Sequence, residues 1–247
     1  MAHIRKAVGF VIRTIDFGES DRIVTVFSRE AGKLSLLAKG ARKTESRFGA
    51  ALDLLTLSEL VYYHREGLKL VSQADIVEAY SKLKGDYEHL VTGLRCARWI
   101  NRLLEDDHAE ERAFILFHHL LDALTQEEGS VILYELAFKL KLLAGLGLDP
   151  TLDRCAVCER IPKQSWFSME KGGILCERCH DGNHAGEFPI DPGTARGLYM
   201  ALRLPFHKLK RLKISEEIAA ASERLIDQFT AHHLRPLPTA RRPLRRE

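Results

Sequence analysis

Short apolar segments separated by polar turns make up most of the first 80 residues, and their period is closer to the two residues of a strand than to that of a helix. Segments rich in Val, Ile, Leu, Phe and Thr predict five strands, over residues 7–15, 21–28, 34–38, 54–64 and 68–74. The turns at 29–33 and 65–67 are short, whereas 40–49 is a long polar loop. Five strands joined in this way predict a small barrel of the OB type, with an SH3-like barrel as the competing shape.

The period changes to that of a helix from about residue 76. Apolar stripes over 90–104 and 113–124 predict two amphipathic helices, and a third is predicted from Ser130 to the glycines and proline of 145–150. Two more are predicted over 194–204 and after Ser215. The apolar run 131–148 contains Glu135, Lys139 and Lys141, which indicates a buried helix and not a membrane span.

Four of the five cysteines form two C-x2-C pairs that are separated by 17 residues. Cys155, Cys158, Cys176 and Cys179 have the ligand spacing of a structural Zn²⁺ site, in which four thiolates close a tetrahedron and leave no position for a substrate. A degenerate site and a redox dithiol are the alternatives. We expect the nearby His180 and His184 to stay outside the ligand set, and Cys96 to be a buried thiol without a role.

These patterns together predict an α+β multidomain protein. An OB-fold barrel would occupy residues 1–80, an α-helical domain 81–150 and 191–247, and an inserted zinc-ribbon-like module with a β-hairpin 151–190. The tail 235–247, with three prolines and five arginines, is predicted to fray. Arg5 and Lys6 interrupt the apolar N-terminus, so we expect no export signal and a cytoplasmic protein.

The composition, 45% hydrophobic and 29% charged, is that of a globular protein, and a net charge of +3 indicates no partner by itself. The ends are nevertheless basic: residues 1–50 have ten basic against five acidic residues, and 191–247 twelve against six. A polyanion could meet such ends, although a solvated surface explains the excess equally well. Basic residues on the turns and long loop of the barrel could bind a single nucleic-acid strand: Arg22, Lys33, Lys39, Arg42, Lys43 and Arg47. Phe48 either stacks on a base or closes the barrel.

Arginines also recur at helical spacing on the first long helix. Arg95, Arg98 and Arg102 lie beside Trp99, and such a face can seat an acidic, apolar peptide. Because five acidic residues follow over 105–111, we favour local ion pairs as the interpretation. The sequence has no phosphate-binding loop, nucleophile elbow or H-E-x-x-H motif, so ATP hydrolysis and the commonest hydrolytic reactions lose support.

Several segments are specific in their order and spacing: GESDR at 18–22, EAGKLS at 30–35, KGARK at 39–43, ADIVEA at 74–79, LAGLGLDP at 143–150, DRCAVC at 153–158 and GGILCERC at 172–179. Together they resemble the RecO family of bacterial DNA repair proteins. Glu159 departs from the family pattern, in which a glycine is common after the first cysteine pair.

The resemblance implies a non-enzymatic, ATP-independent recombination mediator. Such a protein binds single- and double-stranded DNA, anneals complementary strands and, with RecR, assists RecA filament formation on strands coated by the single-strand-binding protein SSB. The resemblance further implies zinc ligation by the four cysteines, DNA contact by the barrel residues named above, and recognition of the acidic SSB tail by the helical domain, with Arg98, Trp99 and Arg102 as candidates. The alternative hypothesis is a zinc-ribbon regulatory adaptor that binds protein partners and uses the barrel only as a scaffold.

Overall fold

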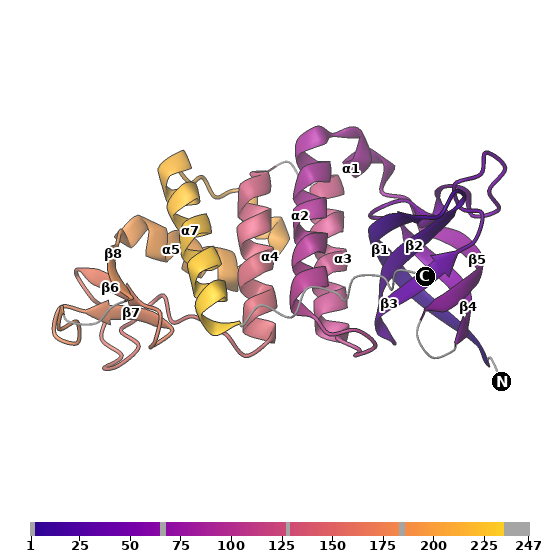
Figure 1. Ribbon diagram of the computed structural model, residues 1–247. Helices are drawn as coiled ribbons and strands as arrows, with labels where there is room; N and C mark the ends of the chain where they lie inside the picture. The colour runs from indigo at the N-terminus through magenta and orange to yellow at the C-terminus, as the bar shows by residue number, and fades with distance from the viewer. Residues whose placement is uncertain (1–2, 65–67, 127–128, 183–185, 235–247) are drawn as a thin grey trace. The chain divides into compact units, whose positions relative to one another are not determined.

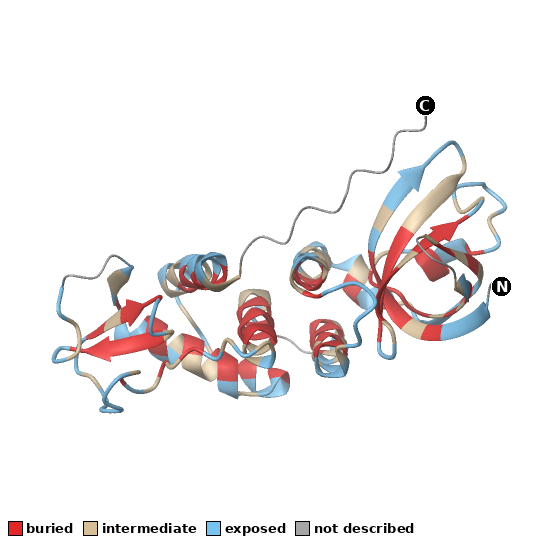
Figure 2. Cartoon of the chain, turned by 60° about the horizontal axis from the view of Figure 1, so that its bottom comes forward, coloured by how far each residue is buried: buried red, intermediate tan, exposed pale blue. Residues whose placement is uncertain are grey.

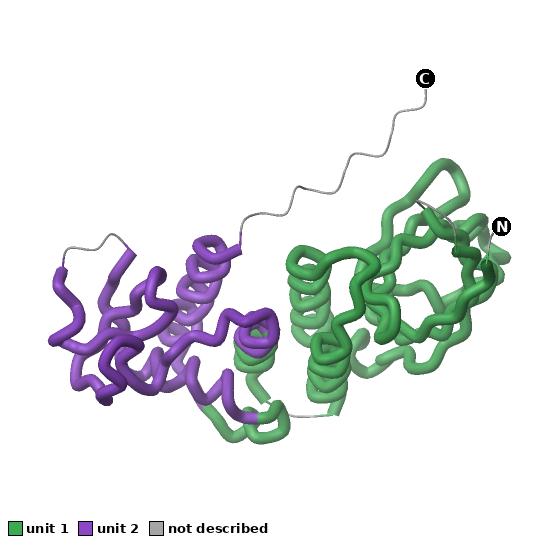
Figure 3. Tube along the Cα trace, turned by 90° about the horizontal axis from the view of Figure 1, so that it is seen from below, with its two compact units in different colours: residues 1–138, 205–212 green, residues 139–204, 213–247 purple. Residues whose placement is uncertain are grey.

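The computed structural model describes residues 3–64, 68–126, 129–182 and 186–234 (Figure 1). The predictions for His184 and for the tail 235–247 therefore lie outside the described residues. The chain divides into two compact units, one of residues 1–138 and 205–212 and the other of residues 139–204 and 213–247 (Figure 3). Each unit has its own sheet and its own helices.

A closed five-stranded barrel opens the first unit, made of β1 (His3–Phe17), β2 (Asp21–Ser28), β3 (Gly32–Ala38), β4 (Leu57–His64) and β5 (Lys69–Glu78). The strand order is β1-β2-β3-β5-β4, and the long β1 closes the ring by pairing with β4 through its first half and with β2 through its second. Only β3 and β5 are parallel neighbours; the other pairs are antiparallel. This topology confirms the predicted OB-type barrel.

Inward-facing apolar residues of the strands fill the barrel. The apolar cluster includes Val24, Leu36 and Leu60, and the short 3-10 helix η1 (Gly49–Leu52) adds Leu52 to it. Phe48, immediately before η1, belongs to the same cluster and is only 3% exposed. Of its two interpretations, closure of the barrel is therefore the correct one, since a buried ring offers no face to a base.

Helices follow the barrel in the first unit: α1 (Ser81–Gly85), α2 (Tyr87–Leu103) and α3 (Glu111–Gln126), with α6 (Phe206–Leu209) returning later in the chain. The boundary between the units falls within α4 (Val131–Gly145), after Phe138. The ring of Phe10 on β1 lies 5.1 Å from the rings of both Phe114 and Phe117, so the outer surface of the barrel packs on α3. Residues 133–140 of α4 are all buried (Figure 2), which confirms the predicted buried helix, and Cys96 is fully buried.

The acidic residues that follow α2 pair with the barrel. A carboxylate oxygen of Asp106 lies 3.0 Å from Nζ of Lys33 on β3, and one of Asp107 lies 2.8 Å from Nζ of Lys69 on β5. The prediction that these acids pair with the arginines of α2 was therefore wrong. Barrel closure brings two nearly buried ammonium groups within reach of the loop, and an ammonium without a counter-charge there would be costly.

The second unit contains a three-stranded sheet in the order β7-β6-β8, from β6 (Ser165–Ser168), β7 (Gly173–Cys176) and β8 (Glu187–Ile190), with helices α5 (Pro192–Arg203) and α7 (Glu216–His233). Asp191 and Ser215 cap the two helices by accepting hydrogen bonds from backbone N–H groups three residues later. The ring of Phe167 on β6 lies 5.8 Å from that of Phe229, which joins the sheet to α7.

The hairpin β6–β7 and the long helices confirm the predicted elements, whereas β8, η1, α1 and α6 were not predicted. These four elements are short, at four or five residues each, and too few side chains then report a period. Among the described residues, no helix combines the length and the apolar character needed to cross a membrane.

Candidate metal centre and nucleic-acid interface

Two tight turns hold the four cysteines. In the first, the backbone N–H of Cys155 donates to the carbonyl of Arg160 at 2.8 Å, and the N–H of Ala156 donates to the carbonyl of Ile174 at 2.8 Å, which fastens the turn to β7. In the second, at the end of β7, the N–H groups of Cys179 and His180 donate to the carbonyl of Cys176 at 3.0 and 2.9 Å. The sheet therefore positions both cysteine pairs at one place.

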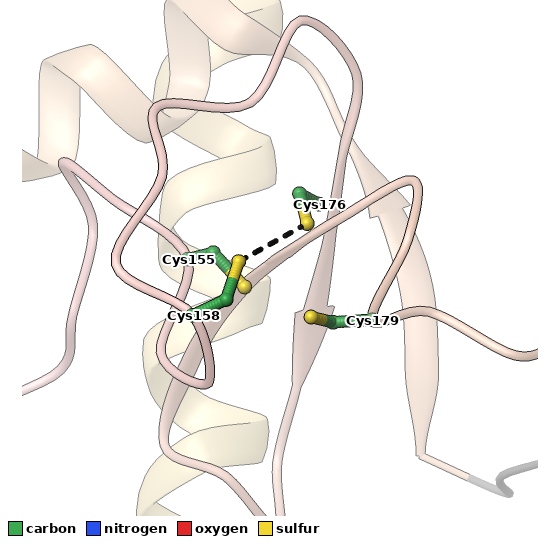
Figure 4. Close-up of side chains that lie close together, drawn as sticks. All are labelled: Cys155, Cys158, Cys176 and Cys179. Atoms are coloured by element: carbon green, nitrogen blue, oxygen red, sulfur yellow. Dashed lines mark hydrogen bonds between the residues drawn. The ribbon is translucent and has the colours of Figure 1, made fainter.

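The Sγ atoms of Cys155, Cys158, Cys176 and Cys179 all lie within 4.8 Å of one another (Figure 4). Those of Cys158 and Cys176, from different turns, are 3.6 Å apart. A tetrahedral ion with metal–sulfur bonds of about 2.3 Å requires sulfur–sulfur separations of about 3.8 Å. The four cysteines thus come together as predicted, in a geometry that fits a four-coordinate soft metal ion.

The thiols of this cluster differ in acidity. Burial raises the pKa of Cys155, but the backbone N–H groups of Cys158, Val157 and Cys176 outweigh burial and lower it to about 6. The backbone N–H of Arg178 likewise lowers the pKa of Cys176, whereas hydrogen bonding to Cys158 raises the pKa of Cys179 to about 12. Four thiolates repel one another at these distances, and a divalent cation relieves that repulsion.

Glu159 closes the first turn with a positive φ of 60°, while its N–H donates to the carbonyl of Cys155 at 2.9 Å. This left-handed conformation costs an L-residue about 1–2 kcal/mol, a cost that glycine does not have. Glu159, where a glycine is common in the family, therefore keeps the geometry of the turn but adds backbone strain to it.

His180 lies beside the cluster without joining it. Its Nδ1 is 2.7 Å from a carboxylate oxygen of the buried Glu187, and its ring is stacked on Trp166 with ring centroids 4.3 Å apart. The imidazole therefore supports the second turn through packing, and among the described residues the cluster of possible ligand atoms consists of the four cysteine sulfurs.

The loop 39–47, between β3 and η1, exposes four of the six candidate DNA contacts: Lys39, Arg42, Lys43 and Arg47. The guanidinium of Arg42 donates to the carbonyls of Gly18 and Glu19 at 3.1 and 3.3 Å, and so ties the loop to the β1–β2 turn. Lys39, Lys43 and Arg47 make no ion pair with another described residue. We call these three residues the loop surface.

The other two candidates are less accessible. Arg22 is half-buried at the start of β2, 3.3 Å from Asp16. Lys33 is 6% exposed, and its Nζ donates to the carbonyl of Asn101 at 2.9 Å in addition to its pair with Asp106. A phosphate could reach Lys33 only by displacing these contacts, and Arg22 is only partly exposed, so the loop surface is the more accessible set.

On α2, Arg98 and Arg102 are exposed, whereas Trp99 is 9% exposed and belongs to the core. Arg95 lies 3.4 Å from the buried carboxylate of Glu135 on α4. The same face of α2 borders Arg13 of β1, a residue that the sequence analysis missed. The signal for it was the apolar run Phe10-Val11-Ile12 immediately before Arg13, which departs from the two-residue period of a strand.

Two family models match this chain. The model described as "Recombination protein O N terminal" covers residues 1–80, and "Recombination protein O C terminal" covers residues 84–243. The chain belongs to the RecO family. Curated RecO relatives match over most of their length. A "DNA repair protein RecO" from Desulfatibacillum aliphaticivorans is 31% identical over 95% of this chain and 94% of its own.

Proteins of the same name from Halalkalibacterium halodurans and Rubrobacter xylanophilus are 30% and 33% identical, over 91% and 80% of this chain and 87% and 80% of their own. This RecO chain is thus related to DNA repair and recombination proteins along nearly its whole length, through the barrel and the cysteine module alike.

Proposed function

We propose that this protein is a non-enzymatic recombination mediator that binds single- and double-stranded DNA and anneals complementary strands. The observation that carries the proposal is the loop surface of Lys39, Lys43 and Arg47, which leaves three cations exposed on an OB-type barrel in a RecO chain. OB folds bind single strands through a positively charged groove and its loops.

Annealing requires that phosphates on two strands be neutralised while the base edges stay free to pair. Lysine and arginine side chains on a loop can do this, because their contacts with phosphates carry no sequence information. The reaction needs no acid, base or nucleophile, and neither ATP nor a phosphate-binding loop takes part in it. With Phe48 buried, electrostatics contributes more to the affinity than stacking on that ring could.

The proposal is tested by reversing all three charges of the loop surface, as K39E, K43E and R47E in one chain. Binding to oligo(dT) should weaken strongly, and the slope of log affinity against log salt should fall in magnitude by about 2, since each phosphate contact contributes about 0.7 for single strands. A control chain with K82E, R112E and R196E has the same change in charge at exposed positions elsewhere.

The control chain should retain at least most of the affinity and the annealing rate of the wild type. Equal DNA binding by the loop-surface variant and the wild type would refute the proposed interface and favour the adaptor hypothesis.

The resident metal is proposed to be Zn²⁺, held by Cys155, Cys158, Cys176 and Cys179. The all-thiolate donor set and the closed arrangement support zinc, which takes four ligands and stabilises a fold without exchanging electrons. Its role would be structural: it joins the turn after α4 to the end of β7. Metal analysis of the purified protein tests the identity of the ion.

The proposed partners are RecR, SSB through its acidic tail, and the RecA filament indirectly, in the cytoplasm beside the nucleoid. Exposed Arg98 and Arg102 support an acidic ligand on α2, while the buried Trp99 would act by packing and not by contact. Annealing of complementary strands coated with SSB, with and without this protein, tests the mediator function. An absence of any acceleration would argue against it.

A further inference from the structure

An aromatic side chain lies exposed at the end of the barrel that carries the loop surface. Phe17 is the last residue of β1, immediately before the turn into β2, and it is 42% exposed. Ile15, two residues earlier on the same strand, is 41% exposed. Neighbouring apolar side chains that are left in water commonly mark a contact surface. These two residues therefore form a candidate contact surface on the barrel.

A β-bulge turns these two side chains toward the outside of the barrel. Before the bulge, Val11 pairs with Val26, and both belong to the apolar core of the barrel. After the bulge, Ile15 pairs with Ile23, which lies three residues before Val26 and therefore on the outer face of β2. Without the extra residue of the bulge, strict alternation from Val11 would place Ile15 and Phe17 inside the barrel. Bulges of this kind are frequent next to functional sites, where they redirect a side chain.

Hydrogen bonds fasten the turn beside Phe17 to the loop 39–47. The backbone N–H of Gly40 donates to Oδ1 of Asp21 at 2.8 Å, and Asp21 is the residue of β2 that pairs with Phe17. The backbone N–H of Arg42 donates to the carbonyl of Ser20 at 3.0 Å. Together with the guanidinium contacts of Arg42 to the same turn, these bonds fix the position of Phe17 relative to the loop surface.

The strand register places Phe17 and Lys39 in one row across the barrel. Phe17 pairs with Asp21 of β2. The next residue of β2, Arg22, pairs with Ala38 of β3, directly before Lys39. Because neighbouring strands are about 4.8 Å apart, the backbones of Phe17 and Lys39 lie roughly 10 Å from each other. A phosphate bound by the flexible lysine can therefore belong to a nucleotide whose base covers the ring.

An exposed ring beside several cations suits a single nucleic-acid strand. Proteins that bind single strands combine cations that follow the backbone with aromatic side chains on which bases stack. Stacking uses the face of a base and leaves its pairing edge free, as annealing requires. In a duplex the neighbouring base pairs cover both faces of each internal base, so only a single strand can use the ring. Contact with an apolar protein surface would not need the cations.

We infer that Phe17 is a base-stacking residue of the barrel, which holds one base of a single strand while the loop surface holds the phosphates. Ile15 extends the apolar surface beside the ring. The inference rests on the proposed function and deepens it, because the ring favours single strands over duplex, which cations alone do not. The buried Phe48 cannot supply this stacking contact.

The test compares F17A with the wild type on three labelled probes by fluorescence anisotropy: oligo(dT), an abasic strand of the same length, and a blunt duplex. F17A should weaken binding to oligo(dT) by about tenfold, because one base loses its aromatic partner. The slope of log affinity against log salt should not change, since no charge is removed. On the abasic strand and the duplex, the two proteins should bind within about twofold of each other.

Two further substitutions separate stacking from apolar contact. F17L keeps an apolar side chain without a ring and should bind oligo(dT) as weakly as F17A. F17W keeps a ring and should retain the affinity, and oligo(dT) but not the abasic strand should quench the emission that this tryptophan adds. Y87A is the matched control, since Tyr87 is an exposed aromatic residue of α2 in the same unit, and it should behave as the wild type on every probe.

Equal affinity of F17A and the wild type for oligo(dT) overturns the inference, and would assign the exposed ring to a protein contact. An equal loss on oligo(dT) and on the abasic strand also overturns it, because the ring would then support the fold of the turn and not a base. Thermal unfolding by circular dichroism verifies that F17A is folded; if it is not, F17W decides, and unquenched emission overturns the inference. Failure of the proposed function has a different signature, namely oligo(dT) binding that is insensitive to the loop-surface variant.

Discussion

The pair formed by Lys69 and Asp107 allows the ionic contacts between barrel and helices to be tested quantitatively. Nζ of Lys69 lies 2.8 and 3.0 Å from the two carboxylate oxygens of Asp107. The lysine side chain is 7% exposed and the aspartate side chain 58%. Removing the carboxylate leaves an ammonium group in a nearly buried position, whereas removing the ammonium leaves a carboxylate that water can solvate.

This difference in exposure between Lys69 and Asp107 determines how much each substitution should lower the free energy of unfolding. A hydrogen bond to a charged group contributes about 1.5–3 kcal/mol, and a fully exposed ion pair about 0.2–1 kcal/mol. Because one partner is buried and the other exposed, D107N should cost about 1–1.5 kcal/mol. Asparagine is the suitable substitution, since Asp107 has a positive φ of 57°, which asparagine tolerates. K69M should cost less than D107N, because the methionine stem replaces the lysine stem in the same apolar surroundings.

The assay is urea unfolding followed by tryptophan fluorescence in a W166F background. The chain has two tryptophans, so Trp99 of the first unit then reports alone. In a double-mutant cycle, D107N should cost almost nothing when Lys69 is already methionine, which gives a coupling energy of about 1 kcal/mol or more. A coupling below about 0.5 kcal/mol, or a K69M cost that exceeds that of D107N, would refute the reasoning.

Three further predictions concern the second unit. E159G should stabilise this unit by about 0.5–1 kcal/mol, because glycine adopts the positive φ without strain. E159A keeps the strain and should not stabilise the unit. The melting temperatures of the two variants, measured by thermal unfolding, test this difference. C158S should reduce the amount of bound metal and lower the melting temperature of the second unit. Its affinity for oligo(dT) should stay within about twofold of the wild type, because the loop surface belongs to the first unit. A large loss of DNA affinity would contradict the structural role of the metal. Burial lowers the pKa of Lys141 to about 8, below its usual 10.5, so the unfolded chain binds the proton more tightly. The free energy of unfolding should therefore increase as the pH rises from about 8 to 10.5, and this gain should be lost as the pH falls back to 8. In K141M the increase should be smaller, and identical pH profiles for K141M and the wild type would contradict the assignment.

The features of the fold that depend on residues close together in the chain could be predicted from the sequence. Segments rich in β-branched and aromatic residues between short turns predicted the barrel, and apolar stripes predicted the long helices, because both signals lie in consecutive residues. The spacing of the two cysteine pairs predicted the four-sulfur cluster for a similar reason, since a turn of two residues brings both sulfurs of a pair to the same side.

Positions that depend on contacts distant in the chain could not be predicted. Lys33 reads as an exposed loop cation in the sequence, yet it is buried and bonded to Asn101 and Asp106. Phe48 had two equal interpretations until the barrel closed around it. In each case the residue type fits both environments, and only packing determines which of them it occupies.

The sequence by itself determined the class of the elements, the zinc-type spacing and the family resemblance, since these depend on neighbours in the chain. The tertiary structure alone decided which charges are free. Lys33 and Lys69 of the barrel pair with Asp106 and Asp107, and Arg98 makes no ion pair with any residue that the structure describes. A β-bulge in β1 places Arg13 near Arg95 and Arg98 of α2. Charge pairing follows distance in space, which periodicity does not encode.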